Sequence, residues 1–161
     1  DWASGADWAM LFKILAGEAV MRRFLIKGGL LAAVLLTGSI TAQESGPMLT
    51  VKQLMNALLT PSTNTIWGAY QLQSQAQWQE VENAALTVIA SGELLAAGGA
   101  ADGEQASAAE ADWQRYNNEM IAAARQVLTA VQQQDEEALS EAGNNALYPP
   151  CESCHQQYQQ R

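Results

Sequence analysis

The residues best suited to chemistry are gathered near the C-terminus, in the run Cys151-Glu152-Ser153-Cys154-His155. This spacing is C-x-x-C-H, the signature of covalent c-type haem attachment. Two thiols can add across the two vinyl groups of one porphyrin. Residues three apart share one face of a helix, so Cys151 and Cys154 can reach the same edge of the macrocycle. His155 follows one turn after Cys151, where its imidazole can bind the iron as proximal ligand. The run therefore predicts one covalently bound haem c.

The motif has competing interpretations, because a bare C-x-x-C also occurs in redox dithiols and in zinc sites. The chain has two cysteines and one histidine in total, whereas a structural zinc ion takes four ligands. A thioredoxin-like dithiol belongs beside a βαβ pattern, and the sequence shows no such pattern. A structural disulfide or an unused dithiol on a terminal helix is the remaining alternative. We interpret the motif as a haem site, on the condition that the chain is exported.

A targeting segment is predicted ahead of the domain that carries the motif. Residues 21–27 form a basic n-region with Arg22, Arg23 and Lys27, 28–40 form a short apolar run, and Thr41-Ala42 places a small residue before Gln43. This is the layout of a secretory signal peptide, so we predict a signal peptide over 21–42, cleavage near Ala42 and a periplasmic location. The apolar run is shorter than the about 20 residues of a membrane span. We therefore expect no stable membrane anchor after cleavage, with an uncleaved anchor as the alternative.

Residues 1–20 begin with Asp1 and precede a complete signal peptide. Because a signal peptide acts from the N-terminus, we interpret 1–20 as an artefact of translation upstream of a start at Met21. The alternative is a real amphipathic helix, with its apolar face formed by Trp8, Leu11, Phe12 and Leu15. The folded domain is then expected over 43–161, a length that supports one modest core.

The composition narrows the classes of partner. The formal net charge is −9, the sequence pI is about 4.4, and hydrophobic residues make up 48% of the chain. Nucleic acid and anionic membrane surfaces repel such an acidic chain, so neither is expected as a partner. Solubility is the simplest reason for the acidity, and steering toward a basic redox partner is the alternative.

Apolar residues recur at helical spacing in four stretches, and no strand-like alternation appears. Capping boxes are predicted to begin the first and third helices, at Thr50–Gln53 and Ser107–Glu110. The predicted helices span about 50–72, 75–97 and 107–133, with a fourth that begins after Asp135 as its N-cap. Inward positions are predicted to include Trp67, Tyr70, Trp78, Leu86, Leu94 and Trp113. We therefore expect an all-α protein, an antiparallel four-helix bundle with the haem attachment motif at its C-terminal end.

Prolines interrupt the first and last of these stretches. Pro61 should either kink the first helix or break it, with Thr60 as a new N-cap. Pro149-Pro150 should stop or kink the fourth helix, and Pro150 could open a last segment that carries the motif.

With these elements in place, the sequence resembles the cytochrome c prime family, the class II c-type cytochromes. The resemblance covers about 48–161. It rests on the C-terminal Cys151-x-x-Cys154-His155, on Tyr158 after it and on three preceding amphipathic helices. It implies a haem inside the bundle, near the C-terminal helix, with its distal face toward the first helix. Members either carry a methionine from the first helix as sixth ligand and transfer electrons, or keep five-coordinate iron and bind nitric oxide or carbon monoxide. Members are often homodimers, so a homodimer is a further expectation.

The sixth ligand is the open question. His155 is the only histidine, which excludes a second histidine ligand from the same chain. Met55 lies in the middle of the first apolar stripe, where the family places its distal residue. A thioether there would raise the reduction potential and favour electron transfer. A methionine at helical spacing is more often core filler, and other residues of the stripe could equally cap an open iron site: Leu54, Leu58 and Leu59. Met120 is expected in the core, and Met48 precedes the helix.

The sequence thus predicts a periplasmic c-type cytochrome, not an enzyme, that exchanges single electrons with an unidentified redox partner protein. The alternative is a five-coordinate haem protein that binds nitric oxide or carbon monoxide. A third class, a haem-free enzyme with Cys151 and Cys154 as its dithiol, lacks an accompanying acid–base constellation.

Overall fold

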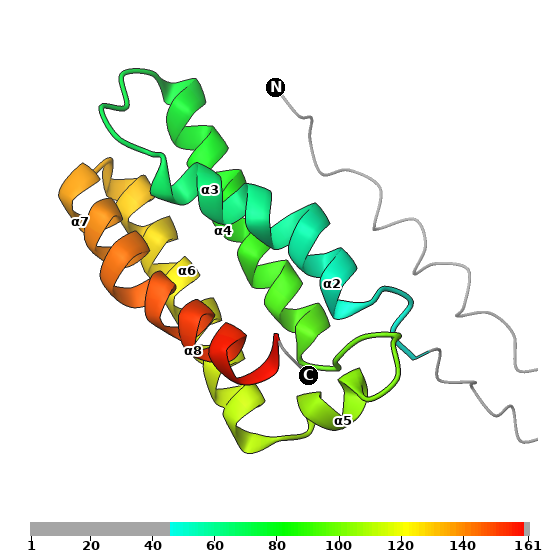
Figure 1. Cartoon of the computed structure of the whole chain (residues 1–161). Helices are drawn as coiled ribbons and strands as arrows, with labels where there is room; N and C mark the ends of the chain where they lie inside the picture. Colours follow the sequence, from blue (N-terminus) through cyan, green and yellow to red (C-terminus); the bar gives the residue numbers. More distant parts are fainter. Residues whose placement is uncertain (1–45, 160–161) are drawn as a thin grey trace, which may run out of the picture. The chain divides into compact units, whose positions relative to one another are not determined.

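The computed structural model of the chain describes residues 46–159, and every regular element in that range is helical, with no strand. Figure 1 shows α8 next to α6, and α4 next to α2 and α3. The predicted all-α class is thereby confirmed. The predicted upstream artefact and signal peptide, 1–20 and 21–42, lie outside the described residues.

Two long helical stretches are each made of three consecutive pieces. The first stretch comprises α2 (Val51–Leu54), the π-helical turn η1 (Met55–Leu59) and α3 (Thr60–Trp67). The last stretch comprises α7 (Glu136–Glu141), the π-helical turn η2 (Ala142–Leu147) and α8 (Tyr148–Tyr158). Between them lie α4 (Gln75–Leu95), the short α5 (Glu104–Ala108) and α6 (Ala111–Gln133).

The π-helical turns explain how the helices accommodate their prolines. In an α-helix, a proline ring clashes with the carbonyl four residues earlier and supplies no N–H. Here η1 ends shortly before Pro61, and η2 ends shortly before Pro149. In both, the first residue after the turn donates its amide to the carbonyl five residues back, which widens the helix at the proline. The helices therefore continue through Pro61 and Pro149-Pro150, so of the two predicted alternatives at 149–150, a stop or a kink, the stop is wrong.

The first stretch ends at Trp67 rather than at the predicted residue 72. Gln71 has a left-handed backbone, with φ at 53°, which an α-helix cannot contain. The amides of Gln71 and Leu72 donate to the carboxylate of Glu136 at 2.9 and 2.6 Å, so the loop is held against the start of α7. Tyr70, which we expected to face inward, is 73% exposed as a result.

Two of the N-caps predicted from the sequence are present in the structure, and one is not. The capping box Thr50–Gln53 is present, and the carboxylate of Asp135 accepts the amide of Ala138 at 3.0 Å. Ser107 lies inside α5 instead of capping the third helix. That helix, α6, begins at Ala111 after Glu110, which makes no side-chain capping bond. The capping box predicted at Ser107–Glu110 is therefore wrong.

The core lies where α4 packs against α6 and α3, and where α6 packs against η2 and α8. Gly92 marks a close approach of α4 to α6. A Cβ at this position would lie 2.5 Å from Cγ1 of Ile121, so only glycine fits without repacking. Leu86 and Leu94 are 49% and 50% exposed, so the apolar face of α4 is narrower than predicted.

Candidate functional site

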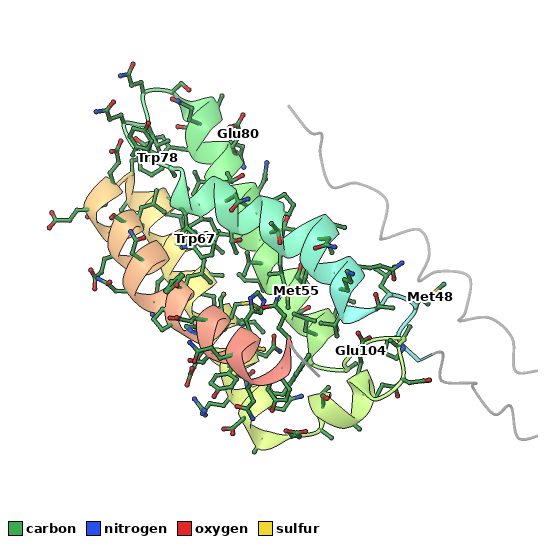
Figure 2. All side chains as sticks on the ribbon, in the orientation of Figure 1. Met48, Met55, Trp67, Trp78, Glu80 and Glu104 are labelled. Carbon is green, nitrogen blue, oxygen red and sulfur yellow. The ribbon has the colours of Figure 1, made fainter. Side chains whose placement is uncertain are left out.

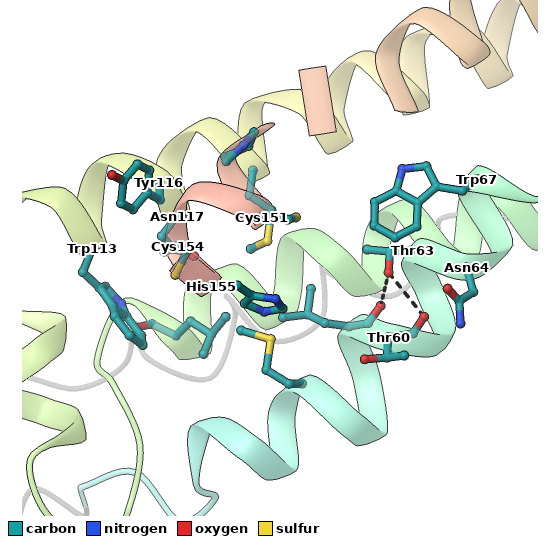
Figure 3. A pocket seen from close by; sticks show the side chains of 15 residues that line it. Thr60, Thr63, Asn64, Trp67, Trp113, Tyr116, Asn117, Cys151, Cys154 and His155 are labelled. Atoms are coloured by element: carbon teal, nitrogen blue, oxygen red, sulfur yellow. Dashed lines mark hydrogen bonds between the residues drawn. The ribbon is translucent and has the colours of Figure 1, made fainter. Parts of the chain in front are cut away.

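The C-terminal helix α8 carries the motif on the side that faces the other helices. Cys151 and Cys154 are half-buried and form no disulfide, while His155 is exposed at the cavity rim. All three side chains line one cavity (Figure 3). The helical spacing that we expected for the motif is therefore present, and it follows directly after the buried Pro150.

The cavity lies between the first helical stretch, α6 and α8, and its lining is mostly apolar. Its volume is about 160 Å³. Pockets that enclose drug-sized ligands measure about 300–1,000 Å³. A macrocycle in this cavity would therefore need the walls to separate, or would leave one edge in solvent.

The predicted distal residue, Met55, lines the same cavity as the motif (Figure 2 shows its place on the first stretch). Leu59 also lines the cavity, whereas Leu54 and Leu58 do not. The structure thus reduces the four candidates of the first stripe to Met55 and Leu59, the first and last residues of η1.

The two other methionines among the described residues, Met48 and Met120, differ in whether they line the cavity. Met48 is 88% exposed and takes no part in the cavity. Met120 is buried, as we predicted, but it also lines the cavity from α6. It is therefore a second thioether within the site, which the sequence alone placed only in the core.

The three tryptophans predicted to face inward also differ in whether they line the cavity. Trp67 and Trp113 line the cavity, whereas Trp78 is buried elsewhere in the core. The indole N–H of Trp113 donates to the carbonyl of Leu95 at 2.8 Å, and that of Trp67 donates to the carbonyl of Gly143 at 2.9 Å. Both rings are thus fixed by backbone carbonyls of neighbouring elements.

Asn117 is a polar residue of the cavity that the sequence analysis missed. It is 6% exposed, and its Nδ2 donates to the carbonyl of Gly92 at 2.8 Å. This bond fixes the orientation of the amide, and Oδ1 is left without a hydrogen-bond partner among the described residues. Such a buried acceptor costs about 1–3 kcal/mol when unpaired. Its position four residues after Trp113, on the same helical face, is the signal that could have identified it.

Burial raises the pKa of both thiols of the motif. The pKa of Cys151 rises to about 11, chiefly through desolvation of the thiolate and then through repulsion from Cys154. Desolvation also raises the pKa of Cys154 above its usual value. Redox-active dithiols depend on a lowered pKa. The pair therefore lacks the lowered thiol pKa that is typical of a redox-active dithiol.

A polar network joins the end of α8 to the start of α6. The hydroxyl of Tyr116, which lines the cavity, donates to Gln157 at 3.2 Å, and the hydroxyl of Tyr158 donates to Glu110 at 2.9 Å. Arg115 lies 4.3 Å from the centroid of the Tyr116 ring. The network holds the helix that carries the motif against α6.

The salt bridge within this network lies at the surface. Arg115 bonds to Asp112 at 2.9 Å, and this contact, with a further bond from Gln157, lowers the pKa of the Asp112 carboxyl. Both side chains are half exposed, so the pair adds little to stability.

The donor set of the cavity fits a covalently attached haem. Two free thiols three residues apart and an adjacent imidazole line one wall, and a thioether lines the facing wall. Thiolates, imidazole and thioether are the groups that hold haem c and its iron. Among residues 46–159, no cluster of three His, Cys, Asp or Glu side chains could hold a bare metal ion.

Comparisons with family models, with curated proteins and with solved structures gave no match to this chain. Within the described part of the chain, no helix has the length and apolar character required to cross a bilayer.

Proposed function

We propose that this protein is a c-type cytochrome of the cytochrome c prime type, a four-helix bundle that holds one covalent haem c and transfers single electrons. One observation carries the proposal: Cys151, Cys154, His155 and Met55 all line one apolar cavity. Of these, the first three come from α8 and Met55 comes from the opposite stretch. The haem, when bound, supplies the Fe(II)/Fe(III) couple.

In this proposal, each residue has a separate role. Cys151 and Cys154 form the two thioether bonds, His155 is the proximal ligand, and Met55 is the distal ligand. The apolar lining excludes water and stabilises the reduced, less charged form of the site, which raises the reduction potential. Trp67 and Trp113 contribute large aromatic surfaces that are already fixed by their indole hydrogen bonds.

The second candidate function is the binding of nitric oxide or carbon monoxide at five-coordinate iron. Leu59 supports it, because this side chain lines the cavity from the same π-helical turn as Met55. If Leu59 rather than Met55 faces the iron, a small apolar space remains for a diatomic ligand. The cytochrome would then be a gas-binding protein without an enzymatic role.

The proposed location follows from the haem, and the proposed homodimer follows from the resemblance to the cytochrome c prime family. Attachment of haem c takes place after export, so we propose a periplasmic protein whose signal peptide is cleaved near Ala42. The proposal includes an electron-transfer partner protein and a homodimer, and neither nucleic acid nor a membrane surface is a proposed partner.

The test is an absorption spectrum of protein matured in the periplasm, recorded oxidised, reduced, and reduced under carbon monoxide. Low-spin bands that carbon monoxide does not shift support the electron carrier, and high-spin bands that it does shift support the gas binder. Absence of any haem band would overturn both.

Matched variants then identify the distal ligand. Met55→Leu should convert a low-spin spectrum to high-spin, whereas Met120→Leu, in the same cavity, should leave it low-spin. Leucine and methionine have similar volumes, so both variants should fold. The opposite result would assign the ligand to Met120.

A further inference from the structure

A second cavity lies beside the first, and Trp67 lines both. Its volume is about 280 Å³, and it lies between the loop after α3 and the stretch α7–η2. Trp67 is 38% exposed, and its ring also packs edge-to-face against Tyr148, with ring centroids 6.2 Å apart. One fixed aromatic ring therefore separates the candidate haem cavity from this outer cavity.

Aromatic surface is unusually accessible around the outer cavity. Tyr70, which lines it, is 73% exposed, and Tyr148 beside Trp67 is 49% exposed. Aromatic faces attract protonated amines and guanidinium groups. The ring positions thus favour a cationic occupant over an anionic one.

The charges around the cavity have one sign. Residues 60–74 and 136–148, which border it, contain no Lys or Arg and carry the carboxylates of Glu136, Glu137 and Glu141. The carboxylate of Glu136 accepts hydrogen bonds from the backbone amides of the loop at 71–72. The carboxylate of Glu141 accepts one from the side-chain amide of Asn145 at 2.6 Å. The exposed carboxylate of Glu137 lines the cavity and makes no hydrogen bond or ion pair with the described residues. A carboxylate available for a partner therefore lies next to exposed aromatic rings.

We propose that this outer cavity is the docking site for a basic partner protein, and that a lysine or arginine side chain of the partner inserts between Tyr70 and Glu137. The inference deepens the proposed electron-transfer function, because it places the partner one indole ring from the candidate haem cavity. A second copy of this acidic chain would bring carboxylates against carboxylates, so the partner is a different, basic protein.

The binding test uses trilysine as the probe and the full chain at low ionic strength. In an NMR titration, the indole N–H signal of Trp67, assigned with Trp67→Phe, should shift as trilysine binds. Glu137→Gln should weaken binding by up to about fivefold, the limit for one exposed charge pair. Tyr70→Leu should weaken it similarly. Glu93→Gln removes the same charge from an exposed position on α4 and should change nothing.

Equal effects of Glu137→Gln and Glu93→Gln, or shifts confined to other signals, would overturn the docking site. The same variants also test the electron-transfer role in the haem-loaded protein. The second-order rate of electron exchange with a basic mitochondrial-type cytochrome c should fall in Glu137→Gln and Tyr70→Leu at low salt, and remain unchanged in Glu93→Gln.

The docking inference and the proposed function fail in different ways. A protein without haem bands that still binds trilysine at Trp67 would refute the cytochrome and retain the cation site. A haem-loaded protein whose Trp67 signal ignores trilysine would retain the cytochrome and refute the docking site.

Discussion

Two helical stretches face each other across the cavity, and each consists of an α-helix, a π-helical turn and a second α-helix that contains proline. They differ in where the cavity residues lie. In the first stretch, the cavity lining begins in the π-helical turn, with Met55 and Leu59, and continues along α3 with Thr60, Thr63, Asn64 and Trp67. In the last stretch, η2 contributes nothing to this cavity, and Cys151, Cys154 and His155 follow it on regular helix.

The difference agrees with the roles that the proposed haem site gives to each wall. Two thioether bonds and an axial ligand need fixed positions three and four residues apart, which an α-helix provides. On the facing wall, the proposal requires only one axial ligand, Met55, for which spacing along the helix matters less than which residue faces inward. A π-helical turn alters that choice, because its extra residue rotates the following side chains about the helix axis.

In the proposed cytochrome, the largest expected effect concerns the attachment wall, the side of α8 that carries Cys151, Cys154 and His155. His155→Ala should remove the proximal bond and abolish the native haem spectrum, since no other histidine can replace it. Gln156→Ala, one residue further along the same helix and exposed, is the control and should leave the spectrum unchanged. An intact spectrum in His155→Ala would show that the attachment wall does not supply the ligand.

A pair of truncations compares the last residues of the two π-helical turns. Leu147→Ala should lower the free energy of unfolding by about 3–5 kcal/mol, because a fully buried side chain leaves a new void. Leu59→Ala should cost less, about 2–3 kcal/mol, because this side chain already borders a cavity. Urea unfolding of the haem-free protein measures both changes in the free energy of unfolding. Equal changes in the two variants would contradict the expected difference between these two positions.

The attachment wall should also respond to pH through its thiols. With the pKa of Cys151 raised to about 11 from 9.0, the folded, reduced, haem-free protein should contain roughly 100-fold less Cys151 thiolate at neutral pH than the unfolded chain. Alkylation by iodoacetamide should therefore be slow at pH 7 and accelerate up to about pH 11.

The same shift predicts a change in stability. The folded state holds the thiol proton more tightly than the unfolded state, so this contribution is fully present below pH 9.0 and is lost as the pH rises toward about 11. Alkylation as fast as in urea would contradict the burial of the pair.

The smallest effects concern the caps that begin the two stretches. Thr50→Ala removes an acceptor for the amide of Gln53, and Asp135→Ala removes one for the amide of Ala138. Each should cost about 0.5–2 kcal/mol in thermal unfolding. Asp135→Ala should cost the more, because its carboxylate also interacts with the helix dipole. The reverse order would indicate that the first stretch depends more strongly on its N-terminus.

Residues with a strong local signature were predictable from the sequence. The motif on α8 and the inward position of Met55 follow from spacing alone, and the cap at Asp135 follows from residue type. Ser107 shows the limit of such signatures, because its own side chain is compatible with a cap but α5 extends over it.

Features that depend on distant contacts were not predictable. Tyr70 continues the apolar stripe, yet Glu136, far along the chain, binds the loop amides and turns this segment outward. Asn117 is a polar residue that the sequence gives no reason to place in a core, because its partner, the carbonyl of Gly92, lies on another helix. The π-helical turns lie just before the prolines, and the spacing of apolar residues does not distinguish such a turn from regular α-helix.

The hydrogen bonds between the two stretches are placed unevenly. Among the described residues, side-chain bonds link them at Trp67 with Gly143 and at the 71–72 loop with Glu136, and none joins η1 to the segment around Cys154 and His155. The side-chain hydrogen bonds thus connect the two stretches at one end only, the end near Trp67. A separation of the stretches at the end that carries the motif would break none of these hydrogen bonds. If the proposed haem enters this cavity of about 160 Å³, the two walls can therefore separate at the motif end while the hydrogen bonds at the other end remain intact.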